Sequence, residues 1–267
     1  MNYKIGFIGA GKMATAIING IIDANICENK NIFVSDIDNT ALKKMEKDLN
    51  ITPLQSNNDI VKMADIIFLA VKPFVVKNVL SNIQNDFKEN QLIVSIAAGI
   101  STKIIENFTG NNPVIRVMPN TPAFVKEGMS AICRGKHATE EQADLICKIF
   151  SNLGKAIKEK EENIDIITAV SGSGPAYFYY FINEIAKAGE KLGLTKETAI
   201  TLSAQTALGS AKMVLETGLP IEQLIKNVTT PGGCTEVGNN VLVEFKTNEI
   251  IAKVIKDTME KAKALGN

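Results

Sequence analysis

The chain has 267 residues, of which 45% are hydrophobic and 22% charged, so it can bury a substantial core as one large domain or two of ordinary size. Lysine plus arginine balance aspartate plus glutamate at 29 each, and a net charge of zero provides no field that would attract nucleic acid or an anionic membrane. The longest apolar runs are too short to cross a bilayer and the N-terminus lacks a signal-peptide layout, so we expect a cytoplasmic protein without membrane or nucleic-acid partners.

The first half of the chain alternates short β-branched apolar runs with amphipathic, lysine-rich segments, a pattern typical of a parallel sheet with crossover helices. After Asp38, residues Leu42, Met45 and Leu49 are spaced for one face of a helix. This half is therefore predicted to be a doubly wound α/β domain. The expected strands are 3–8, 32–35, 65–70, 92–95, 114–118, 130–133 and 155–157.

After about Asn163 the strand signals stop, and segments with helical spacing run to the C-terminus, interrupted at SGSGP, at Gly218–Pro220 and at TTPGG. We predict an all-helical second half and place the boundary near residue 160. The mixed charges of residues 155–162 indicate a solvated face.

Cysteine and histidine usage limits the available chemistry. The cysteines lack C-x-x-C spacing, which predicts reduced thiols without a disulfide framework or zinc site; they are Cys27, Cys133, Cys147 and Cys234. His137 is the single histidine and is expected at the surface or at a helix N-cap. No metal is predicted, because one histidine cannot form a histidine-rich metal centre. A histidine-based catalytic triad is not expected either.

The N-terminal motif Gly9-Ala-Gly11-Lys-Met-Ala14 follows a predicted strand and opens a predicted helix. The first glycine permits a tight turn, the second permits close approach of a pyrophosphate, and the small third residue permits packing of helix on strand. In this context the motif predicts dinucleotide binding, and the alternative is an ordinary glycine-rich turn.

Asp36 follows the second strand, where a carboxylate can accept from the ribose 2′-hydroxyl and repel a 2′-phosphate. Ile37 and not arginine comes next, so NADH is favoured over NADPH. Ser35, Lys43 or Lys44 would still tolerate the phosphate, and the alternative role of Asp36 is to cap the next helix.

Two later turns, Ala70-Val-Lys-Pro73 and Ile96-Ala-Ala98, lie at the carboxyl ends of strands, where open α/β sheets bind ligands. Their small residues and proline suit close approach to a flat ring. Lys72 precedes proline in a turn, which favours a positional role over proton donation.

Four motifs follow the glycine turn in a specific order: AVKP from Ala70, MPNTP from Met118, SGSGPAY from Ser171 and TTPGG from Thr229. Together they resemble the pyrroline-5-carboxylate reductase family over nearly the whole chain. The resemblance implies an oxidoreductase that reduces 1-pyrroline-5-carboxylate to L-proline by hydride transfer from NAD(P)H, the last step of proline biosynthesis. It also implies an N-terminal Rossmann-like domain over 1–160 and a helical substrate and dimerisation domain over 161–267, giving a homodimer or a larger ring of dimers.

The resemblance also assigns residues, with an active site between the nicotinamide and the helical domain, near the subunit boundary. The implied cofactor contacts are Ile8, Gly9, Ala10, Gly11, Lys12, Met13, Asp36, Asn57, Ala70, Val71, Lys72, Pro73, Ile96, Ala97, Ala98 and Asn120. The implied substrate contacts are Gly232, Gly233, Cys234 and Thr235, with Ser171 as a candidate wall of the site. Thr235 is the implied catalytic hydroxyl partner of the ring nitrogen.

The residues of TTPGG suit that role physically. Gly232 and Gly233 permit close approach of a carboxylate to the N–H groups at a helix start, and Thr235 offers a rotatable hydroxyl. On its own the segment equally fits a helix stop followed by an N-cap. In SGSGPAYFYYF the small residues likewise fit a kink at a helix crossing, and its Phe/Tyr stripe favours core or subunit interface over a substrate cage.

Several residues depart from the family pattern, namely Pro220, Cys234, Glu236, Asn239 and Asn240. Cys234 at a helix start is expected to be a reactive thiol. These departures keep a related cyclic-imine carboxylate reductase as an alternative. A non-catalytic nucleotide sensor is the other alternative, and the intact glycine motif, TTPGG and Thr235 argue against it. A β-hydroxyacid dehydrogenase would need a lysine on a glycine-rich helix, and the SGSGP segment has none before Lys187.

Overall fold

The structure, a computed structural model, describes residues 3–265. The chain divides into two compact units. The first unit contains the residues up to Ser173 together with those from Thr258 onward, and the second is Gly174–Asp257.

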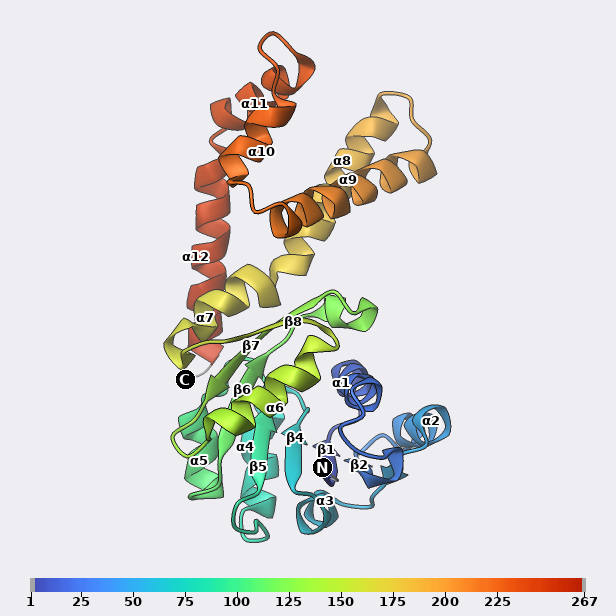
Figure 1. Cartoon of the computed structure of the whole chain (residues 1–267), viewed down its shortest axis with the longest axis vertical. Coiled ribbons are helices and arrows are strands. Elements are labelled where there is room, and N and C mark those ends of the chain that lie inside the picture. Colours follow the sequence, from blue (N-terminus) through green and yellow to red (C-terminus); the bar gives the residue numbers. More distant parts are fainter. Residues whose placement is uncertain (1–2, 266–267) are drawn as a thin grey trace. The chain divides into compact units, whose positions relative to one another are not determined.

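The first unit is built on an eight-stranded sheet in the order β3-β2-β1-β4-β5-β6-β7-β8 (Figure 1). Neighbouring strands are parallel except β6 and β7. The order runs outward from β1 and β4, so the topological switch point, where such sheets bind ligands, lies between these two strands. The strands are β1 (Ile5–Ile8), β2 (Ile32–Ser35), β3 (Thr52–Pro53), β4 (Ile66–Leu69), β5 (Leu92–Ser95), β6 (Val114–Met118), β7 (Gly128–Arg134) and β8 (Gly154–Lys158).

Helices cover both faces of this sheet, as its continuous apolar strands require. The buried residues of α1, α2 and α6 form one core, and those of α3, α4 and α5 form a second core on the other face (Figure 1). Phe7 of β1 and Phe68 of β4 stack at 4.6 Å within the first core, which joins the two strands at the switch point. These helices are α1 (Lys12–Asp23), α2 (Asn39–Leu49), α3 (Asn57–Met63), α4 (Pro73–Ile83), α5 (Thr102–Thr109) and α6 (Glu140–Ser151).

The doubly wound α/β fold predicted from the sequence is confirmed. The predicted helix after Asp38 is α2, whose first N–H groups donate to the Asp38 carboxylate. The predicted strands are present with shifts at their ends, and β3 was missed because it has only two residues and contains Pro53.

Two expectations, one about the segment 155–162 and one about His137, need correction. The segment 155–162 is not simply a solvated face: Glu161 accepts hydrogen bonds from Thr102 and from the buried Arg116, because its carboxylate turns inward beside β6. His137 is half-buried and does not cap a helix; Thr139 caps α6 in a reciprocal arrangement with Gln142.

The helical second half is also confirmed. After η3 (Glu161–Asn163), the chain forms α7 (Ile164–Ile167) and a π-helical turn, Thr168–Gly172, within the first unit. The second unit begins with α8 (Gly174–Lys191), so SGSGP widens the helical path into a π turn where the sequence suggested a break. It continues with α9 (Lys196–Glu216), α10 (Ile221–Val228), α11 (Cys234–Glu244) and the start of α12 (Thr247–Leu265).

The second unit has almost no core of its own. Between residues 174 and 257 the structure buries only Gly174, Ala186, Ala199 and Ser203. Large apolar side chains are exposed instead, including Phe178 at 64% and Ile185 at 60%. The Phe/Tyr stripe is therefore not core in the single chain, and its expected role as subunit interface stays a prediction.

No helix within residues 3–265 is long and apolar enough to cross a membrane. The expected domain boundary at residue 160 stays a prediction. In the structure, residues 161–173 pack with the first unit.

Candidate active site

The glycine turn lies at the switch point between β1 and β4. Gly9 has a φ of +110°, and a Cβ there would lie 2.7 Å from the carbonyl oxygen of Ala70, so only glycine fits. Gly11 is the N-cap of α1, and a Cβ added to it would meet no atom within 4 Å. The turn is thus closed toward the sheet and open in front of a helix N-terminus, which suits a pyrophosphate.

Asp36 braces this turn. Its carboxylate accepts from the backbone N–H of Ala10 at 2.5 Å and from that of Asp38 at 2.9 Å. The sequence placed Asp36 beside a ribose but did not reveal the bond to Ala10, because the two residues are far apart in the chain. The acid therefore fixes the shape of the glycine turn whatever it binds.

Asn57 is joined to the same edge of the sheet. The hydroxyl of Ser35, the last residue of β2, donates to the side-chain oxygen of Asn57 at 2.8 Å. Asn57 is the first residue of α3, after the capping Ser56. The end of β2 and the start of α3 thus form one hydrogen-bonded rim.

The two later turns lie where the sequence placed them. Pro73 begins α4 directly after the exposed Lys72, which is the N-cap residue. The segment 96–98 follows β5, and the N–H of Ala97 donates to the hydroxyl of Ser95 at 3.3 Å. Both turns are at the carboxyl ends of strands parallel to β1, so they share the edge with the glycine turn.

Asn120 and Ser171 are brought together at the end of β6. The Asn120 side-chain nitrogen donates to the Ser171 carbonyl at 3.0 Å, and its side-chain oxygen accepts from the N–H of Met129 at 2.9 Å. Sequence reasoning assigned these two residues separately to cofactor and substrate. No motif signal indicated their bond.

The TTPGG turn belongs to the second unit and joins α10 to α11. Gly232 has a φ of +75° with open space around it, whereas a Cβ at Gly233 would lie 2.9 Å from the carbonyl oxygen of Thr230. Gly233 is the N-cap of α11, and Cys234 and Thr235 are the exposed first residues of that helix. The geometry thus presents helix N–H groups and a hydroxyl in one exposed turn.

Glu236 occupies part of this turn. Its carboxylate accepts from the N–H of Gly232 at 2.8 Å, while the N–H of Gly233 donates to Thr230 at 2.8 Å. The turn therefore already holds a carboxylate of the chain itself, a contact that no motif in the sequence predicts.

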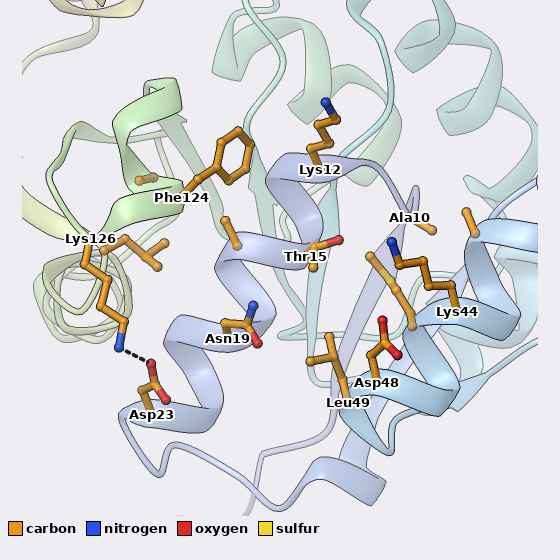
Figure 2. Close-up of a pocket in the computed structure, with 15 residues that line it drawn as sticks. Ala10, Lys12, Thr15, Asn19, Asp23, Lys44, Asp48, Leu49, Phe124 and Lys126 are labelled. Atoms are coloured by element: carbon orange, nitrogen blue, oxygen red, sulfur yellow. Dashed lines mark ion pairs between the residues drawn. The ribbon is translucent and has the colours of Figure 1, made fainter. Parts of the chain in front are cut away.

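A cavity of about 770 Å³ lies beside the candidate site, between α1, α2 and η2 (Thr121–Val125). Several of its lining residues lie along α1 (Figure 2), and Lys126 pairs with Asp23 at one end of this row, with 2.9 Å between the charged atoms. Of the predicted cofactor residues only Ala10 and Lys12 line it. It is thus a groove that shares these two residues with the predicted cofactor site.

Burial raises the pKa of three of the four thiols. It raises the pKa of Cys27 to about 11 and that of Cys133 to about 12, with added repulsion from Glu28 and Glu161 respectively, and it also raises the pKa of Cys147. Cys234 is the exposed cysteine.

Comparisons with known proteins agree along the whole chain. The family model for pyrroline-5-carboxylate reductase dimerisation matches residues 161–265, and the model for NADP oxidoreductase, coenzyme F420-dependent, matches residues 4–99. The chain is 40% identical to a pyrroline-5-carboxylate reductase of Methanosarcina acetivorans, over 99% of this chain and 98% of that protein.

Two solved structures are similar over the full length. The pyrroline carboxylate reductase of Plasmodium falciparum with NADP bound has a TM-score of 0.89 at 35% identity, covering 100% of this chain and 99% of that one. The pyrroline-5-carboxylate reductase of Coxiella burnetii has a TM-score of 0.93 at 34% identity, covering 100% of both chains. With its sheet, its glycine turn and its dimerisation segment all matched, this chain belongs to the pyrroline-5-carboxylate reductase family.

Proposed function

We propose that this chain reduces 1-pyrroline-5-carboxylate to L-proline with NAD(P)H, the last step of proline biosynthesis. The observation that carries the proposal is the open glycine turn at the switch point of a chain that also bears the exposed TTPGG turn. The direct test is oxidation of NADH or NADPH with 1-pyrroline-5-carboxylate as substrate, read at the nicotinamide absorbance. A protein that binds the dinucleotide without turnover would instead be a nucleotide sensor.

The first unit's share is to hold and orient the dinucleotide. The N–H groups at the start of α1 face the open space before Gly11 and would bind the pyrophosphate. The turns at Ala70–Pro73 and Ile96–Ala98 would shape the nicotinamide end of the same edge. When bound, the reduced nicotinamide supplies the hydride, and the protein supplies position and electrostatics.

The second unit's share is to hold the substrate. The N–H groups at the start of α11 are suited to a carboxylate, and the open space around Gly232 permits its approach. Glu236 is held at that glycine, so a substrate carboxylate that used the Gly232 N–H would displace it. Thr235 would orient the ring nitrogen through its hydroxyl, as donor or acceptor.

Thr235 is expected to act as an orienting and relaying group, because a threonine hydroxyl does not titrate near neutral pH. A substrate that arrives as the iminium ion accepts hydride without a strong acid. Replacement of Thr235 by alanine is therefore expected to lower kcat/KM about tenfold or more, which corresponds to about 1.4 kcal/mol of transition-state stabilisation, with the fold and the dinucleotide affinity unchanged. Steady-state kinetics with both substrates measure this.

Two matched variants separate the hydroxyl from the shape of the side chain. Thr235→Val keeps the volume and removes the hydroxyl, so it should behave like the alanine variant, whereas Thr235→Ser should retain most activity. Wild-type turnover in Thr235→Val would remove this residue from the mechanism.

The chain uses NAD(P)H, and we propose that NADH serves at least as well as NADPH. Asp36 supports this, because a carboxylate has about four acceptor sites and only two are used by Ala10 and Asp38. The remaining sites can accept from a ribose hydroxyl, while the charge repels a 2′-phosphate. The ratio of kcat/KM for NADH to that for NADPH is expected to be about one or higher, and to fall in Asp36→Asn. A wild-type preference for NADPH would leave Asp36 as a brace of the turn only.

Finer points extend the proposal. Ring-size specificity is a separate question, and a panel of five- and six-membered cyclic imine carboxylates tests whether a related imine is preferred. The dimerisation segment supports self-association, and we propose a homodimer that assembles into a ring of dimers. A cytoplasmic location is part of the same proposal.

A further inference from the structure

Two sequence motifs that lie far apart in the chain interlock inside the first unit. Met118 ends β6 and is followed by Asn120, while Ser171 and Gly172 belong to the π turn Thr168–Gly172. Asn120 is 9% exposed, and its side-chain amide bridges the Ser171 carbonyl and the Met129 N–H at 3.0 and 2.9 Å. One buried amide therefore ties the π turn to the start of β7.

The π turn is also held by packing. A Cβ at Gly172 would lie 2.3 Å from the terminal methyl carbon of Met118, so the methionine fills the space that this glycine leaves. Within the turn, the N–H of Ser173 donates to the Thr168 carbonyl at 2.8 Å, and the Ser171 hydroxyl donates to the Ile167 carbonyl at 3.1 Å. Ser171 is thus held by Asn120 through its carbonyl and by Ile167 through its hydroxyl.

This interlock stands at the edge of the sheet that binds the cofactor. β1, β4, β5 and β6 are parallel, so their carboxyl ends share one edge with the glycine turn. π turns are rare and recur at functional sites because the widened helix places backbone groups that an α-helix would not. A fixed π turn at this edge is therefore suited to shaping the space around the reacting ring.

We propose that Asn120 is a positioning residue: it does not bind the dinucleotide but sets the place of the π turn, and that place governs the rate of hydride transfer. The amide is required because it offers a donor to Ser171 and an acceptor to Met129 at once. This proposal rests on the reductase activity proposed above. It replaces the expectation that Asn120 contacts the cofactor.

The isosteric variant Asn120→Asp gives the sharpest test. At neutral pH its carboxylate would face the Ser171 carbonyl with no hydrogen to donate, and kcat should fall about tenfold or more because small displacements at a reacting centre are costly. Burial raises the pKa of such a carboxyl, and its protonated form can donate to Ser171 while accepting from Met129. Activity relative to wild type at the same pH should therefore recover below about pH 6.

The controls separate positioning from stability and from cofactor binding. Asn120→Ala lacks both groups and should stay slow at every pH. Asn112 is a buried asparagine before the opposite end of β6, 7% exposed, whose oxygen accepts from Gln91, so Asn112→Asp should leave kcat and its pH profile unchanged even if Tm falls. The dinucleotide Kd of Asn120→Asp, measured by fluorescence titration, should match wild type.

Two results would overturn the inference. One is a loss of dinucleotide affinity in Asn120→Asp equal to the loss of activity, which would make Asn120 a cofactor contact. The other is a relative activity of Asn120→Asp that does not change with pH. Failure of the reductase proposal is distinguishable, because wild-type protein would then lack turnover while all variants still bound the dinucleotide.

Discussion

Replacing both Phe178 and Ile185 by aspartate is expected to abolish dimer formation and to lower kcat/KM about a hundredfold or more. These residues are seven positions apart on α8 and share a face, and their side chains are 64% and 60% exposed in the single chain. An interface that covers them would have to bury two unpaired carboxylates, each at a cost of several kcal/mol.

Activity should be lost with the dimer because the second unit cannot stabilise itself. Its 174–257 segment buries four residues, far fewer than a domain core needs. The TTPGG turn and Thr235 are held by α10 and α11 of that unit. When the apolar faces of the unit are exposed to water, these helices no longer hold the turn in one position.

Analytical ultracentrifugation and steady-state kinetics on the same preparation check this expectation. Lys191→Asp, at the exposed polar end of α8, introduces the same charge on the same helix and should remain a dimer with normal turnover. A fully active monomer of the double variant would show that the apolar face of α8 has no part in assembly.

Glu161→Ala is expected to lower the free energy of unfolding by about 3 kcal/mol, because it strips a buried guanidinium of its partner. Arg116 has a side chain 6% exposed and pairs with Glu161 at 3.2 Å, and its second terminal nitrogen is buried without a hydrogen-bond partner among the described residues. The same glutamate accepts from the N–H of Thr102 at 2.7 Å and from its hydroxyl. One carboxylate thus joins β6, the start of α5 and η3.

Glu162, the neighbour of Glu161, provides the matched control. Glu162 pairs with Lys160 at 3.6 Å with both side chains more than two-thirds exposed, so Glu162→Ala should change stability by less than about 0.5 kcal/mol. Adding Arg116→Leu to Glu161→Ala should recover part of the loss, since removing both charges leaves none unpaired. Urea denaturation of the four proteins measures these differences, and equal midpoints for the two alanine variants would contradict the assigned burial cost.

The sequence predicted the parts of the fold that rest on local chemistry. Short apolar runs marked the strands, apolar residues at helical spacing marked α2, and two glycines marked a turn whose backbone admits no other residue at Gly9. Each of these signals lies within a few residues of the structure it specifies, which is why they could be read without coordinates.

The parts that escaped prediction depend on residues distant in sequence. Glu161 stands in a run of alternating charges, and nothing local distinguishes it from Glu162, yet Arg116 draws its carboxylate inward. The π turn at SGSGP likewise depends on Met118 filling the space at Gly172. Residues of the candidate site were recognisable as motifs, but their mutual bonds, such as that of Asn120 with Ser171, were not.

The last turn of α12 has a consequence for dissecting the protein. Gly99, which directly follows the predicted cofactor segment Ile96–Ala98, has a φ of +76°, and a Cβ on it would lie 3.0 Å from the Cβ of Leu265. The dinucleotide unit is thus discontinuous in sequence, since it is completed by residues from Thr258 onward. A gene fragment that stops at residue 160 encodes the sheet without the helical turn that covers Gly99. Isolating this unit calls for replacing residues 174–257 by a linker that joins Ser173 to Thr258, so that the C-terminal turn is kept.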